Sequence, residues 1–450
     1  IPISDVDAQA LAELEADGIV RPVRRGHTVQ FSHDIFFEWA FLQHLVRADD
    51  AWPEVIREVG EPPALGRVVE LLSQAELAHG ENWSNHLAAL EGNQRLRSQW
   101  LRAWMAGPFS LETFAQYSTA FDRAMLDTVH SRVRKVVVWY QAEKTKPNTA
   151  ILERSDTTPD LDLAKRMLYA DMLGHPSDVA AWARFCDWLL DHASDIPTSV
   201  IPEVVSAFEV WQNMFSQYRN PVSERIVQTC LAWLYHLQHQ LHRREFSTDR
   251  GVWSEIEGRR DGLEELESAL RTLVLNSSLT QRTLVTQYLR DLRLLEQMPR
   301  QAVQSVFTHA PFLSRTCPGE LADFTLSVVR KRLPVVVKRE LRGRDFLVSH
   351  SFSHFEWDHL SIDDQHSFFP SAPTREPFHS LLLQAPDQGR RLVREVANHA
   401  TRSWRQLHRL SHEKEGTPIP LVMQFPWGTQ VFWGDSRLYL GARGYFGPST

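Results

Sequence analysis

Four side chains that could bind a metal ion or transfer protons lie within ten residues of one another. They are His350, His354, Asp358 and His359, and imidazole with carboxylate is a ligand set that suits zinc or another first-row ion. Their spacing does not match a helical H-E-x-x-H motif, and Ser, Phe and Trp separate them. We therefore interpret this segment as a polar loop packed with aromatic residues, and a metal-dependent hydrolase is the minor alternative.

A phosphate-binding loop is absent from the 450 residues of the sequence. No G-x-x-x-x-G-K-[ST] string occurs, and Gly441-Ala-Arg-Gly444 lacks both the lysine and the preceding strand that could replace it. ATP hydrolysis is therefore not assigned to this chain, and we predict no catalytic residue and no cofactor within it.

The most informative string runs from Val29 to Leu42 and reads V-Q-F-S-H-D-I-F-F-E-W-A-F-L. It resembles the winged-helix signature of STAND and NACHT-type regulatory NTPases, in which F-x-H precedes an apolar residue, E-[YFW] and A. The matching residues are Phe31, His33, Glu38, Trp39 and Ala40. Phe41 is larger than the small residue that often follows, and the resemblance covers about 40 residues of the chain.

The resemblance implies a nucleotide-sensing role for His33. In that family the winged helix packs against the nucleotide-binding domain, and the motif histidine can approach the β-phosphate of bound ADP. An imidazole N–H can donate to a phosphate oxygen, so the role is chemically reasonable. ATP or ADP would then bind a longer parent protein whose P-loop domain precedes Ile1. The alternative is a histidine at a helix start that only caps or packs.

The elements that must position His33 are a helix, a hairpin and a second helix within residues 1–48. Helical spacing from Asp5 to Val20 ends at Gly18, and two β-prone runs follow on either side of Arg25-Gly26. The next helix carries Ile35, Trp39, Leu42 and Val46 at helical spacing. We expect that face to be buried against the hairpin in a winged-helix unit.

The remainder predicts a mainly α chain with a small α+β end. Residues 49–344 contain alternating helices and short breakers typical of an α-solenoid-like array. Residues 345–450 are rich in Ser, His, Pro and aromatic residues, with one helix at 386–407 and a strand meander over 420–440. We predict an incomplete C-terminal recognition unit there.

The composition of the chain limits the cellular compartment and the classes of partner that we expect. The net charge of −7 argues against a chain drawn as a whole onto nucleic acid, and no run approaches the ~18 apolar residues of a membrane span. Cys186, Cys230 and Cys317 are too far apart to suggest a disulfide framework, which favours a reducing cytoplasm. Ile1 and Thr450 lack the features of natural chain ends, so we expect a piece of a longer protein.

We therefore expect the sensor and regulatory part of a STAND-like protein, with an upstream NTPase domain and a protein trigger as partners. The layout resembles Avs-type antiphage sensors, which form homo-oligomers on activation. Long aromatic loops on a scaffold are common recognition surfaces. The expected partner-binding residues are His350, His354, Trp357, Trp427 and Trp433.

The second function that we consider is a DNA-binding transcription regulator with a helical inducer-binding region. Its candidate recognition helix, Asp5 to Asp17, carries Asp7, Glu13 and Glu15, which would repel a phosphate backbone. We rank this alternative below the sensor.

Overall fold

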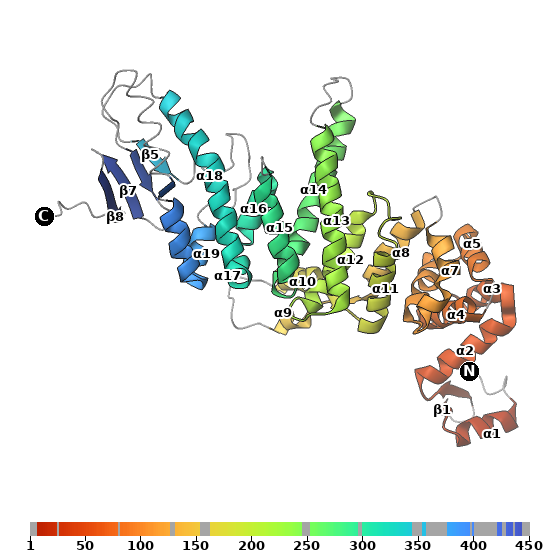
Figure 1. Ribbon diagram of the computed structural model, residues 1–450. Coiled ribbons are helices and arrows are strands. Elements are labelled where there is room, and N and C mark those ends of the chain that lie inside the picture. Colours follow the sequence, from red (N-terminus) through yellow and green to blue (C-terminus); the bar gives the residue numbers. More distant parts are fainter. Residues whose placement is uncertain are drawn as a thin grey trace. The chain divides into compact units, whose positions relative to one another are not determined.

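The computed structural model is mainly helical, with about 80% of the described residues in helices. It describes residues 7–24, 27–79, 82–126, 131–153, 163–244, 253–295, 299–343, 353–356, 376–396, 398–399, 421–424, 429–434 and 437–442. The chain forms two compact units, Ile1–Met214 and Phe215–Thr450. Figure 1 labels their elements along the chain.

Unit 1 begins with helix α1 (Ala8–Ala16), an antiparallel hairpin of β1 (Val20–Arg24) and β2 (Thr28–Phe31), and helix α2 (Asp34–Ala48). Asp7 starts α1 by accepting the backbone N–H groups of Gln9 and Ala10, and Gly18 follows its end at φ +71°. A small core of Leu11, Val20 and Val29 joins the helix to the hairpin. The expected order of helix, hairpin and helix is confirmed.

The face of α2 that we expected to be buried is instead largely exposed. Ile35 is 68% exposed, Trp39 64% and Val46 46%, so this expectation is wrong. The helix is apolar on more than one side, and the hairpin packs against a different side from the one that we expected. There the ring centroids of Phe31 in the hairpin and Phe37 in α2 lie 6.0 Å apart. Periodicity shows that a helix has an apolar face, but here it could not show which of two faces the neighbours cover.

The rest of unit 1 is a compact helical assembly. Its α-helices are α3 (Trp52–Glu58), α4 (Gly66–His79), α5 (Trp83–Gly92), α6 (Ser98–Ala106), α7 (Phe114–Met125), α8 (Ser131–Lys144), α9 (Thr149–Glu153), α10 (Leu163–Met172), α11 (Val179–Asp191) and α12 (Ile201–Phe215). Three 3-10 turns lie at Asp49–Ala51, Pro63–Leu65 and Gly107–Ser110, and β3 (Thr145–Lys146) pairs with β4 (His175–Pro176).

Aromatic rings form the centre of unit 1. The indole of Trp104 stacks on Trp52 at 5.4 Å and on Trp83 at 6.1 Å, and all three side chains are buried. The Trp83 indole N–H donates to Ser73 Oγ at 2.9 Å, and the Trp104 indole N–H donates to the Trp83 carbonyl at 3.3 Å. The stacked rings bury large apolar areas, and the indole N–H groups of Trp83 and Trp104 have hydrogen-bond partners inside this core.

Unit 2 continues with longer helices and a four-stranded sheet. Its helices are α13 (Pro221–Arg244), α14 (Trp253–Asn276), α15 (Arg282–Leu294), α16 (Arg300–Thr308), α17 (Ala310–Thr316), α18 (Pro318–Gly343), α19 (Glu376–Gln384) and residues 386–396, with a 3-10 turn at Ser277–Leu279. The strands are β5 (Ser353–Glu356), β6 (Leu421–Gln424), β7 (Thr429–Gly434) and β8 (Arg437–Ala442).

The sheet has the order β5-β6-β7-β8, with β5 parallel to β6 and the other pairs antiparallel. The expected meander over 420–440 is therefore confirmed as β6, β7 and β8. Strand β5 and helix α19 lie where we expected loops, and α19 packs against α17 and α18. The sequence around β5 has no clear apolar alternation, and its parallel partner β6 is far along the chain.

Two simpler expectations can also be compared with the structure. Cys186, Cys230 and Cys317 are buried free thiols, as their spacing suggested. Among the described residues, none of the helices combines the length and the apolar character needed to cross a membrane.

The buried tryptophan stack predicts a large difference between two helical tryptophans. Trp104→Ala should lower the free energy of unfolding of unit 1 by about 3–5 kcal/mol, because it leaves a cavity between two indoles. Trp39→Ala removes an exposed ring, so we expect a change within about 0.5 kcal/mol. Urea unfolding followed by far-ultraviolet circular dichroism measures both, and equal losses would show that the stack is not central to the core.

Candidate functional site

His33 lies at the N-cap position of α2, where its side chain is exposed and makes no capping hydrogen bond. Its ring centroid is 5.9 Å from that of Phe36 in the next turn. The hairpin thus presents the imidazole to solvent rather than to the core. Of the two structural explanations of this histidine, capping is not seen, and packing remains through the contact with Phe36.

The expected partner-binding residues are only partly within the described chain. His350, Trp357 and Trp427 lie outside the described residues, and so do Asp358 and His359 of the potential metal set. His354 lies in β5, and Trp433 lies in β7 opposite Leu421 of β6. The backbone therefore places His354 and Trp433 on the two strands that flank β6. Within the described part of the chain, no three His, Cys, Asp or Glu side chains converge as metal ligands.

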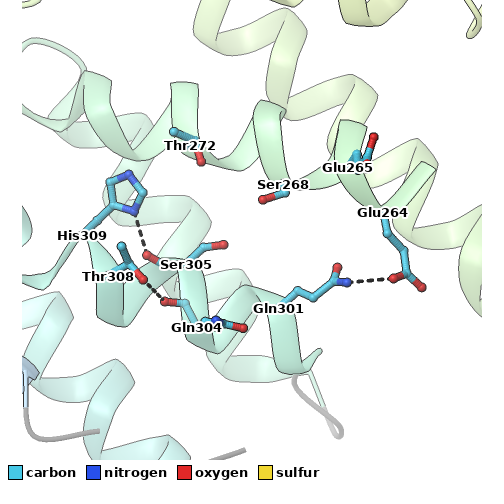
Figure 2. Close-up of a pocket in the computed structure, with 9 residues that line it drawn as sticks. All are labelled: Glu264, Glu265, Ser268, Thr272, Gln301, Gln304, Ser305, Thr308 and His309. Carbon is cyan, nitrogen blue, oxygen red and sulfur yellow. Dashed lines mark hydrogen bonds between the residues drawn. The ribbon is translucent and has the colours of Figure 1, made fainter. Parts of the chain in front are cut away.

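A polar groove lies between α14 and α16 in unit 2. Its volume is about 480 Å³. Figure 2 shows that the two helices contribute facing rows of side chains, with Glu264 opposite Gln301 at one end and Thr272 near His309 at the other. The lining residues are Glu264, Glu265, Ser268, Thr272, Gln301, Gln304, Ser305, Thr308 and His309.

Hydrogen bonds within the groove fix several of its side chains. Gln301 Nε2 donates to Glu264 Oε2 at 2.8 Å, and Thr308 Oγ1 donates to the Gln304 carbonyl at 2.9 Å. His309 Nδ1 is 2.7 Å from the Ser305 carbonyl. A carbonyl can only accept, so Nδ1 carries the proton of this bond.

His309 is neutral near pH 7, because burial lowers the pKa of its imidazole. A neutral ring that donates through Nδ1 has an unprotonated Nε2, which is a hydrogen-bond acceptor. No described residue donates to this nitrogen. One end of the groove therefore carries an acceptor on a ring whose orientation is fixed.

Behind the groove lies a buried ion pair. Arg271 is 0% exposed and Glu267, one turn earlier on α14, is 4% exposed, and Arg271 Nη2 donates to Glu267 Oε1. Arg271 Nε also donates to Tyr288 Oη at 3.0 Å, and Nη1 donates to Ser305 Oγ at 3.4 Å. Burial raises the pKa of Tyr288 to about 12, so its phenol is neutral and can accept this bond. Ser305 thus belongs to both the ion-pair cluster and the groove.

The groove is suited to binding rather than to covalent chemistry. Within its described lining, His309 makes no hydrogen bond to a hydroxyl, so a base and nucleophile pair is not formed. Carboxylates, hydroxyls and amides in a cavity of this size can instead orient a polar ligand.

Our interpretation of the sequence missed this groove. A signal was present: α16 carries Gln301, Gln304, Ser305 and Thr308 on one side, and His309 follows directly after the helix, so the row contains no Lys, Arg, Asp or Glu. Faces that only meet solvent usually carry charges, so an uncharged polar row flanked by apolar positions suggests a contact surface. Its pairing with α14 is a tertiary contact that the sequence alone does not specify.

The buried pair predicts a non-additive loss of stability. Arg271→Met leaves Glu267 charged and unpaired in the core, so we expect unit 2 to lose about 3–5 kcal/mol of unfolding free energy. The double variant Arg271→Met, Glu267→Met removes both charges and should be more stable than the single variant. Arg330→Met, which breaks the half-exposed pair with Glu395, should cost at most about 1 kcal/mol. Chemical denaturation measures all three, and additive losses would rule out the coupling.

Comparisons with known proteins do not place the chain in a family. No protein-family model matches it, and a search of curated proteins found no significant match.

Proposed function

We propose that this chain is the sensor and regulatory part of a STAND-like ATP-binding protein. In this proposal the chain recognises a protein trigger and relays the event to an NTPase domain upstream in the same polypeptide, in the cytoplasm. The relay acts in antiviral defence, and activation produces a homo-oligomer. The residues 1–48 act as a winged-helix unit, and the helical array that follows serves as a solenoid-like scaffold.

The observation that carries the proposal is the uncovered surface around His33. This histidine begins α2 with an exposed, uncapped imidazole, and the same helix exposes Ile35, Trp39 and Val46. An exposed apolar helix face beside a potential phosphate donor is the surface that a nucleotide-binding domain would cover. Large helical assemblies also offer extended surfaces for protein partners, and we retain His354 and Trp433 on the β5-β6-β7 strands as trigger contacts.

A role for His33 in nucleotide sensing is tested in the parent polypeptide, expressed with its upstream coding sequence. His33→Ala should lower the retention of adenine nucleotide after purification and raise the basal oligomer size, because the imidazole no longer donates to the phosphate. The matched control is His44→Ala, which removes an exposed histidine from the same helix. Nucleotide analysis by chromatography and size by light scattering give the readouts. Identical behaviour of the two variants would leave His33 without a sensing role.

DNA binding is the second candidate, and the order of helix, hairpin and helix at residues 8–48 favours it. Against it, α1 exposes Glu13 and Glu15, and Asp7 and Asp17 flank the helix. These carboxylates would oppose phosphate contacts.

We expect this chain to show no sequence-selective binding to duplex DNA. A titration of binding against salt concentration is decisive, since phosphate contacts release counterions and give a steep slope. Submicromolar, salt-sensitive and sequence-selective binding would instead favour the transcription regulator. A scrambled duplex of equal length is the control.

A further inference from the structure

We infer that the groove between α14 and α16 binds an arginine side chain from a basic segment of a protein partner. This inference rests on the proposed function, since it names the chemistry of a partner that the chain recognises. It adds a surface in the helical part of unit 2 to the strand contacts proposed above.

The charge of the groove favours a cation. Glu264 and Glu265 place two carboxylates at one end (Figure 2), and Glu265 makes no ion pair with any described residue. The nearby positive charge of Arg271 is offset by Glu267, to which it is bonded inside the core. His309 adds no positive charge, because its imidazole is neutral near pH 7. The described lining residues therefore carry a net charge of about −2 near neutral pH.

The hydrogen bonds also favour a ligand that supplies donors. Three donors of the lining are already used inside the groove: the Gln301 amide on Glu264, the Thr308 hydroxyl on the Gln304 carbonyl, and His309 Nδ1 on the Ser305 carbonyl. The acceptors that remain include His309 Nε2 and the Glu265 carboxylate. The hydroxyls of Ser268 and Thr272 can still donate, so it is the two negative charges that disfavour an anion such as phosphate.

The length of the groove fits a side chain that is attached to a peptide better than a small free ligand. From Glu264 to Thr272 the row on α14 extends eight residues, which is about 12 Å along a helix. A guanidinium group with five N–H donors in one plane fits the carboxylate end, where a bidentate contact is possible. The peptide backbone can then place an N–H group near His309 Nε2 at the other end. An ammonium group would use fewer of these acceptors, so lysine should bind more weakly.

The test uses the full chain and a fluorescent peptide that contains three arginines separated by glycines. We expect saturable binding measured by anisotropy, with tighter binding than the same peptide with lysine. The peptide with citrulline, which keeps the shape but not the charge, should bind at least about tenfold more weakly. Hydrogen–deuterium exchange should show protection of residues 300–309 on peptide binding.

Variants separate the groove from general electrostatic attraction. Glu265→Gln should weaken the binding of the arginine peptide about tenfold, because it removes a charge-assisted contact. Glu224→Gln removes the same charge from an exposed position in α13, and we expect little change. Equal effects of the two substitutions, equal binding of the citrulline peptide, or protection elsewhere in the chain would overturn the inference.

The test of the groove and the test of the proposed function can succeed or fail independently. Peptide binding at the groove is measured with the chain alone, whereas nucleotide sensing by His33 is measured in the parent polypeptide. Binding without any effect of His33→Ala would keep the groove and remove the NTPase relay. If the peptide does not bind but His33→Ala still impairs nucleotide sensing, the NTPase relay is kept and the groove is removed as a binding site.

Discussion

The burial of the Arg271 guanidinium is the constraint on which the organisation of the helices in unit 2 depends. A charge that is fully removed from water is tolerated only with an opposite charge and with partners for its remaining N–H groups. Glu267 supplies the charge from α14, Tyr288 supplies an acceptor from α15, and Ser305 supplies one from α16. Gln238 of α13 also donates to Glu267 at 3.3 Å. Four helices must therefore keep their mutual positions for one side chain to remain satisfied.

The same constraint shapes the polar groove. Because Ser305 Oγ accepts from Arg271, the Ser305 residue is held at the junction between core and groove, and its carbonyl holds the His309 ring. The ring orientation then determines that Nε2 is the acceptor available to a ligand. Side chains already fixed by the fold lose little conformational entropy on binding, so such a groove can recognise a ligand with few contacts. A buried ion pair that adds little net stability can thus contribute to specificity by fixing the surface in front of it.

Local patterns were sufficient to predict much of this fold. Gly18, the β-prone runs beside it and the strand sequence around Val431 specify their elements through short-range preferences, and the structure has them in the expected places. The buried face of α2 was predicted wrongly, because Ile35 and Trp39 are as apolar as Phe37 and only the tertiary neighbours decide between them. The groove was not predicted at all, since Glu264 and Gln301 belong to rows that meet only when α14, α15 and α16 pack. Periodicity identifies a face, but the choice of partner for that face depends on contacts between distant residues.

The two exposed surfaces differ in chemistry, and the difference bears on how a sensor could use them. The α2 face of Ile35, Trp39 and Val46 is apolar, and a surface of this kind is stabilised mainly by removal from water, which suits a contact that persists within one polypeptide. The groove in unit 2 is lined by carboxylates and other hydrogen-bonding groups. The free energy of binding there therefore depends on the charge of the ligand and on salt concentration, and water hydrates the lining when no ligand is bound. A reversible trigger requires a site that is stable in both the free and bound states. Under the proposed function, the polar groove meets that requirement and the apolar face of α2 does not. The groove is therefore assigned to capture of the partner, and the α2 face to the lasting contact with the upstream domain.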